Sequence, residues 1–129
     1  TIEILCSSRL HDFANKRLFP DQVVRNGTKS CVVPYATPGL PLREAIKTSV
    51  EEFIGRNGFF PKLILLKNHG IITASASIQE ATVSTLMCEK SAEIYIGAKM
   101  LNIVQFLTPE EVAAVDTNPS EKYRRELYK

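Results

Sequence analysis

The strongest constraint in this sequence is a continuous aliphatic run, Leu63–Leu66, in which no polar residue alternates with the apolar ones. A run of that kind is typical of a strand that is buried on both faces of a sheet. A second apolar run, Ile71–Ala74, follows after the turn residues Asn68, His69 and Gly70. We therefore expect two short strands that are separated by an Asn-His-Gly turn.

Long helices are predicted on both sides of these strands. Apolar residues over Leu42–Ile54 recur at helical spacing, and Asn57-Gly58 ends that helix with residues suited to positive φ. Ser77 and Glu80 have the spacing of a capping box, and they begin a longer helix that runs to about Leu101. At a rise of about 1.5 Å per residue this helix is roughly 37 Å long. A helix of that length spans a small domain or reaches a partner subunit.

The remaining segments are shorter. The sequence predicts a helical tail over residues 1–9, a turn of helix at Asp21–Arg25, a brief strand at Cys31-Val32-Val33, an irregular loop over Tyr35–Pro41, and helix starts at Thr108-Pro109 and Asn118-Pro119. Two or three strands do not make a sheet that stands alone. We therefore expect residues 1–129 to be the C-terminal portion of a single domain, with 108–129 as a helical C-terminal extension.

Composition excludes several classes of protein. A chain of 129 residues that is 44% hydrophobic can bury one core, so it is globular rather than disordered. A formal net charge of +2 gives no reason to expect nucleic acid or a membrane surface as a partner. Cys6, Cys31 and Cys88 are far apart and form no CxxC motif, which favours free thiols and a cytoplasmic location.

His69 is the sharpest candidate for chemistry. It lies in a turn at the carboxyl end of the buried strand, where an imidazole can bind a divalent metal or transfer a proton. The alternative is an ordinary tight hairpin with an exposed histidine. The only other histidine, His11, is expected in a polar loop, and nothing in the spacing requires the two to share a metal.

The second candidate is the segment Val33–Gly39, which is rich in proline. It is either a linker between a strand and a helix or a rigid loop that lines the same pocket as His69. In the second case Tyr35 is the pocket residue of interest, because its phenol can donate a hydrogen bond or a proton.

Taken together, three segments resemble the class II aldolase/adducin head family, over roughly residues 19–107. The segments are VPYATPG, PKLILLKNHGIITASASIQEA and MCEKSAEIYIGAKML. The family holds zinc-dependent sugar-phosphate aldolases, a phosphopentose 4-epimerase and the noncatalytic adducin head. The resemblance implies an α/β fold, an α/β/α sandwich around a largely antiparallel sheet, which we expect to be incomplete at the N-terminus. It also implies a homotetramer with sites at the subunit interfaces.

The resemblance also implies a metal site. Zinc, or another divalent metal, is held in the family by three histidines, and the third ligand matches His69. The other two, in a His-x-His motif, are expected just before Thr1, and the catalytic glutamate and phosphate-binding residues further upstream. The catalytic tyrosine of the fuculose-phosphate enzyme falls near Leu18–Phe19, where this sequence has no tyrosine. We therefore assign no catalytic residue here.

The implied reaction is aldol cleavage of a ketose phosphate or related small sugar through a zinc-stabilised enediolate. It belongs to the full-length protein, and we expect the 129 residues alone to be inactive. Two alternatives stay open: a noncatalytic, adducin-like oligomerisation module, and a phosphopentose 4-epimerase that shares the metal but not the fate of the enediolate.

Overall fold

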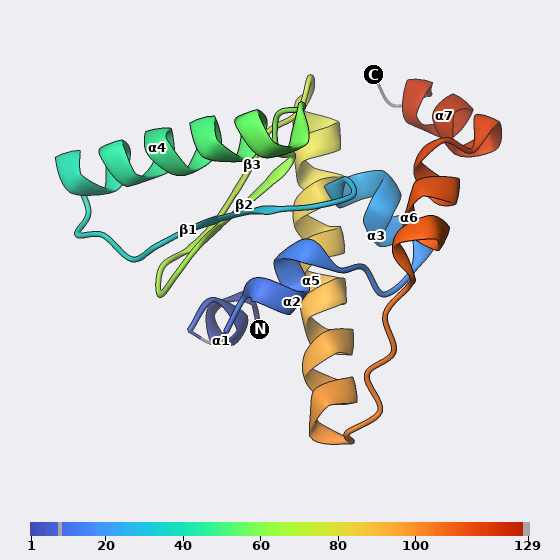
Figure 1. Cartoon of the computed structure of the whole chain (residues 1–129), viewed down its shortest axis with the longest axis horizontal. Helices are drawn as coiled ribbons and strands as arrows, with labels where there is room; N and C mark the ends of the chain where they lie inside the picture. Colours follow the sequence, from blue (N-terminus) through green and yellow to red (C-terminus); the bar gives the residue numbers. More distant parts are fainter. Residues whose placement is uncertain (8, 128–129) are drawn as a thin grey trace.

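A computed structural model describes residues 1–7 and 9–127 of the chain as a small sheet surrounded by helices (Figure 1). The elements, in chain order, are α1 (Ile2–Cys6), α2 (His11–Asn15), α3 (Pro20–Asn26), β1 (Cys31–Val33), α4 (Leu40–Asn57), β2 (Leu63–Leu66), β3 (Gly70–Thr73), α5 (Ile78–Met100), α6 (Pro109–Asp116) and α7 (Pro119–Glu126).

The sheet in the described residues has three strands in the order β1-β2-β3. β1 and β2 are parallel, with Val33 beside Leu66, and α4 makes the crossover that a parallel pair needs. β2 and β3 are antiparallel, with Leu66 beside Gly70. The described sheet is therefore mixed, with one parallel and one antiparallel pair.

The central strand β2 is buried along its whole length, as the aliphatic run predicted. Its alternate residues face two different cores. Leu63 and Leu65 pack in a cluster with residues of α1, α2 and α5, whereas Ile64 and Leu66 pack with β1 and with Phe53 of α4. Helices therefore cover both faces of the sheet, which confirms the α/β class and the layered arrangement.

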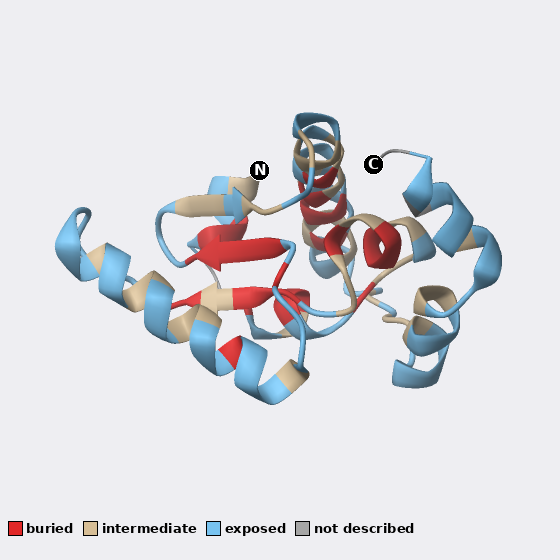
Figure 2. Cartoon of the chain, turned by 90° about the horizontal axis from the view of Figure 1, so that it is seen from above, coloured by how far each residue is buried: buried red, intermediate tan, exposed pale blue. Residues whose placement is uncertain are grey.

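The long helix α5 crosses the molecule beside the sheet (Figure 1). Its predicted N-cap is confirmed, because the Ser77 hydroxyl accepts a hydrogen bond from the Glu80 N–H at 3.2 Å. The second half of the predicted capping box differs, since the Glu80 carboxylate accepts from the N–H of Ala76. Figure 2 shows buried residues in the strands and the middle of α5, whereas α4 is exposed along most of its length.

Two local predictions are wrong. His11 does not lie in a loop but begins α2, whose Phe13 and Ala14 are buried. The irregular loop ends at Gly39 rather than at Pro41, because proline is well tolerated in the first turn of a helix and α4 already begins at Leu40.

One residue that the sequence did not single out, Arg17, is 1% exposed. Its guanidinium donates to the carbonyls of Gly27 at 2.8 Å, Phe13 at 3.1 Å and Ala14 at 3.2 Å, and to the Ser30 hydroxyl at 2.8 Å. Burial lowers the pKa of Arg17 to about 10, so the group is charged at neutral pH. A buried cation therefore ties α2 to the segments before and after α3.

The substitution Arg17→Met removes the guanidinium donors from buried acceptors such as the Gly27 carbonyl and the Ser30 hydroxyl, whereas the Ala14 carbonyl keeps its hydrogen bond from the Ser30 N–H. Each buried unsatisfied group costs about 1–3 kcal/mol, so we expect a loss of about 3 kcal/mol or more in the free energy of unfolding, measured in urea. An exposed arginine of α4 provides the control: Arg43→Met is expected to change stability by less than about 0.5 kcal/mol. Equal effects of the two substitutions would contradict this role for Arg17.

Candidate functional site

The two motifs that the sequence singled out come together at one end of the sheet. Because β1 and β2 are parallel, both strands end at the same edge, and the Lys67 N–H donates to the Val33 carbonyl at 3.0 Å. The loop that carries Tyr35 and the turn that carries His69 therefore leave the sheet from neighbouring strands.

The Asn-His-Gly turn is held by several backbone contacts. The His69 N–H donates to the Leu66 carbonyl at 3.0 Å, and Asn68 has the left-handed φ of 56° that asparagine tolerates better than most residues. The Asn68 N–H donates to the carbonyl of Cys6 at 2.8 Å, and the Cys6 thiol lies 3.3 Å from the Gly70 carbonyl. The end of α1 thus fixes the backbone of the turn.

The side chains of this turn and loop face solvent. His69 is exposed, Tyr35 is 60% exposed, and neither lines the cleft described below. Among residues 1–7 and 9–127, no three His, Cys, Asp or Glu side chains lie close enough to hold a metal ion. His11 and His69 therefore do not form a site with a carboxylate here, and this part of the chain does not by itself fit a metal.

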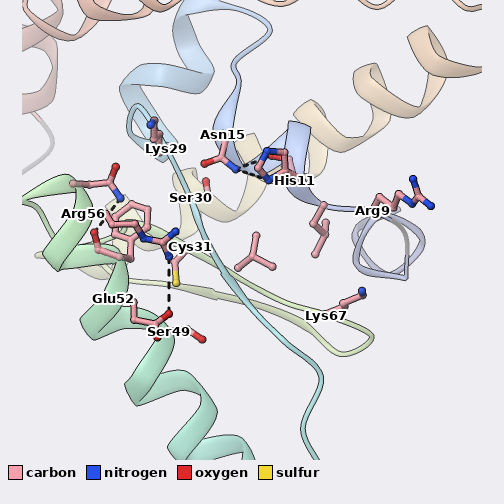
Figure 3. Close-up of a pocket in the computed structure, with 14 residues that line it drawn as sticks. Arg9, His11, Asn15, Lys29, Ser30, Cys31, Ser49, Glu52, Arg56 and Lys67 are labelled. Carbon is pink, nitrogen blue, oxygen red and sulfur yellow. Dashed lines mark hydrogen bonds and ion pairs between the residues drawn. The ribbon is translucent and has the colours of Figure 1, made fainter.

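A cleft of about 580 Å³ lies between α2, the outer edge of β1 in the described sheet and the C-terminal half of α4 (Figure 3). Its lining comes from segments that are distant in sequence, which is why sequence analysis missed it. The lining residues are Arg9, Leu10, His11, Asn15, Lys29, Ser30, Cys31, Val32, Ser49, Glu52, Phe53, Arg56, Asn57 and Lys67.

Basic side chains dominate this lining. Arg9, Lys29, Arg56 and Lys67 line it, and Glu52 is the only carboxylate among the described residues that do so. The Glu52 carboxylate lies 4.0 Å from the Arg56 guanidinium. Both side chains are exposed, so Glu52 neutralises the charge of Arg56 only weakly. The cleft therefore has a positive electrostatic potential, which favours an anionic ligand.

Cys31, whose thiol is buried, is one of the residues that line the cleft. Burial raises the pKa of this thiol, and the nearby Arg56 guanidinium opposes that effect only in part. The neutral thiol is therefore the favoured form, and it is a poor nucleophile. The arrangement supports binding of an anion rather than covalent catalysis by Cys31.

The family model described as Class II Aldolase and Adducin N-terminal domain matches residues 8–96. The chain is similar to two crystal structures of YgbL, whose activity is given only as aldolase/epimerase/decarboxylase. The Escherichia coli protein is 24% identical with a TM-score of 0.69, over 90% of this chain and 53% of that one. The Klebsiella pneumoniae protein is 27% identical with a TM-score of 0.70, over 88% and 52%.

A third similar structure is an aldolase II superfamily protein from Pseudomonas syringae. It is 20% identical with a TM-score of 0.61, over 99% of this chain and 51% of that one. The chain thus spans about half the length of the solved structures it matches. None of the curated proteins matches it. The described residues therefore show the common fold, and they hold the predicted His69 turn within the matched segment.

The three thiols provide a test of this electrostatic description. Cys6, Cys31 and Cys88 are all buried, and burial raises the pKa of Cys88 from 9.0 to about 12. We expect iodoacetamide to modify the native thiols about 100-fold more slowly than those of the protein unfolded in urea, measured by peptide mass spectrometry. Fast native modification of Cys31 would contradict its neutral, buried state.

The same shift predicts a pH dependence of stability. The folded state favours the neutral Cys88 thiol, so its contribution is fully present below pH 9 and is lost as the pH rises toward 12. Urea unfolding of the wild type and of Cys88→Ala across this alkaline range measures the contribution of Cys88 to the free energy of unfolding. With rising pH the wild type should lose more stability than Cys88→Ala.

Proposed function

Because this chain belongs to the class II aldolase and adducin family, we propose that the whole protein is an enzyme that makes or breaks a carbon–carbon bond in a small sugar. The finer proposal is aldol cleavage of a ketose phosphate, with a divalent metal, zinc in the first instance, as the Lewis acid. The observation that carries the proposal is the rigidly held turn that presents His69 at the end of the central strand.

Rigidity matters at this turn because a metal ligand works best when its backbone is positioned before the metal binds. The Asn68 N–H is engaged by α1, and the His69 N–H by β2, so both residues have a defined backbone. The exposed imidazole of His69 is then free to take a partner from outside the described residues. An ordinary hairpin would not need the contact with Cys6.

The remaining metal ligands are proposed to come from parts of the whole protein that lie outside these residues. This follows from the absence of any cluster of three metal-ligating side chains within the described part of the chain. By itself the 129-residue chain would neither hold a metal tightly nor catalyse. Tyr35 shares the end of the sheet with His69, so it is proposed as a residue that borders the completed pocket.

The proposed assembly is a homotetramer in the cytoplasm that acts on a small sugar. Support for an assembly comes from α5 and its C-cap, where Leu86 and Ile94 of the helix and the capping Leu101 are 64%, 42% and 70% exposed. Exposed apolar side chains on one helix are what a subunit contact covers. In the described residues no helix has the length and apolarity that a bilayer crossing requires.

Metal content tests the function. We expect the whole protein to retain about one divalent ion per chain after dialysis, and His69→Ala to lose most of it together with sugar cleavage, since three protein ligands are usual at a catalytic zinc. His11→Ala is the matched control and should keep its metal. Metal content is measured by elemental mass spectrometry, and cleavage by the appearance of two smaller products.

Two other outcomes would redirect the proposal. A whole protein that binds no divalent metal and cleaves no sugar would indicate the adducin-like, noncatalytic module. A metal-dependent protein that interconverts phosphopentoses without forming smaller products would indicate the epimerase.

A further inference from the structure

The two residues on either side of His69 are both held by one residue of α1, Cys6. Its carbonyl accepts from the Asn68 N–H at 2.8 Å, and its thiol donates to the Gly70 carbonyl at 3.3 Å. We propose that α1 couples α5 to the His69 turn, with Cys6 and, on α5, Glu89 as positioning residues for His69. That the His69 side chain is the group to be positioned rests on the proposed function, whereas the coupling itself does not.

The tip of the turn has little burial of its own to hold it. The side chains of Lys67, Asn68 and His69 are all exposed. Within the hairpin, the His69 N–H donates to the Leu66 carbonyl at 3.0 Å. Exposed segments with few buried contacts open locally at a low cost in free energy. The two hydrogen bonds to Cys6 therefore connect an exposed tip to the buried part of the molecule.

Cys6 is suited to this contact because it is completely buried, with 0% of its surface exposed. Its carbonyl lies at the end of α1, where the last carbonyls of a helix have no acceptor role within the helix and are available to other donors. Its thiol supplies one further proton, on the opposite side of His69. A residue without a side-chain donor at position 6 would hold only the Asn68 side of the turn.

The other end of α1 is anchored on α5. The Glu89 carboxylate accepts from the Ile2 N–H at 3.2 Å, in a partly buried contact. An N–H in the first turn of a helix has no acceptor within that helix, and the helix dipole favours a carboxylate there. Between the two ends, Leu5 is 1% exposed and packs in the cluster that contains Cys88 and Ala92 of α5.

The contacts at the two ends of α1 form one connection from α5 to the turn. α1 has five residues, and a helix of that length is not stable alone, so its position is set by what it packs against. Ile2 and Glu89 are 87 positions apart, and Cys6 and Gly70 are 64 apart, which is why the sequence did not reveal the connection. Each of these contacts joins two described residues.

Hydrogen exchange in the whole protein tests the coupling. Glu89→Ala removes the anchor of α1, so the amides of the turn, Asn68 among them, should exchange about tenfold faster, the factor that one hydrogen bond contributes. The difference should persist in EDTA, so that it does not depend on bound metal. Glu93→Ala is the matched control, because Glu93 is an exposed glutamate one turn further along α5, and it should leave the turn unchanged.

Mass spectrometry of peptides reads the turn and β2 in the same sample, and β2 reports any general opening. Exchange of the turn that is equal in Glu89→Ala and in the wild type would overturn the coupling. Exchange that rises equally in the turn and in β2 would overturn it as well, because the effect would then be general destabilisation.

Iodoacetamide measures the same coupling at Cys6. The buried thiol reacts only when its contact with the turn opens, so Glu89→Ala should speed modification of native Cys6 about tenfold. Cys31 is the internal control, since it is buried in the other core, with β1 and α4, and should react at an unchanged rate. Equal acceleration at Cys6 and Cys31 would contradict a local connection through α1.

Two substitutions at Cys6 test the thiol itself. Cys6→Ala removes the donor to the Gly70 carbonyl and should speed exchange of the turn severalfold, whereas Cys6→Ser keeps a donor and should restore most of the protection. Cys31→Ala controls for the loss of a buried thiol, and it should leave exchange of the turn unchanged even where it lowers stability in urea. Exchange as fast in Cys6→Ser as in Cys6→Ala would overturn the role of the thiol.

Divalent-metal affinity of the same variants relates the coupling to the proposed function. We expect Cys6→Ala and Glu89→Ala to bind the ion severalfold more weakly, and Cys6→Ser and Glu93→Ala to bind it as the wild type does. Unchanged affinity in Cys6→Ala and Glu89→Ala would overturn the positioning of His69. A whole protein that binds no metal but shows the exchange differences would contradict only the proposed function, so the two failures are distinguishable.

Discussion

The burial of β2 on both faces is the constraint on which the rest of this structure depends. Four consecutive aliphatic residues cannot leave either face of a strand in water without a large cost in free energy. One core therefore forms on each side, with α5 and the N-terminal helices at Leu63 and Leu65, and α4 at Ile64 and Leu66. The turn that carries His69 is placed by the same strand, because it begins where the aliphatic run ends.

Arg17 carries a second constraint, on the segment between α2 and β1. Within this segment α3 buries Val23 and Val24, and hydrogen bonds from one buried guanidinium to backbone carbonyls also hold the segment in place. The desolvation of that cation is offset by these bonds rather than by a carboxylate. The same guanidinium donates to the hydroxyl of Ser30, which lines the neighbouring cleft.

The two candidate sites share one end of the sheet and differ in how they are built. The His69 turn is a local feature on one hairpin, and it supplies a single imidazole to a site that needs further ligands. The cleft is non-local, because its cations come from the segment before α2, from the one before β1, from α4 and from the turn after β2. Lys67 belongs to the cleft and lies two residues before His69, so the two regions share one end of the sheet.

The sequence by itself determined the elements with strong local signals. These are the buried strand, the cap at Ser77, the break at Asn57-Gly58 and the position of His69, because each depends on neighbouring residues or on periodic burial. Only the tertiary structure decided that His11 begins a helix, that Arg17 is buried and that Lys29 and Arg56 line one cleft. Those outcomes depend on contacts between residues distant in the chain, and neither propensity nor periodicity records such contacts.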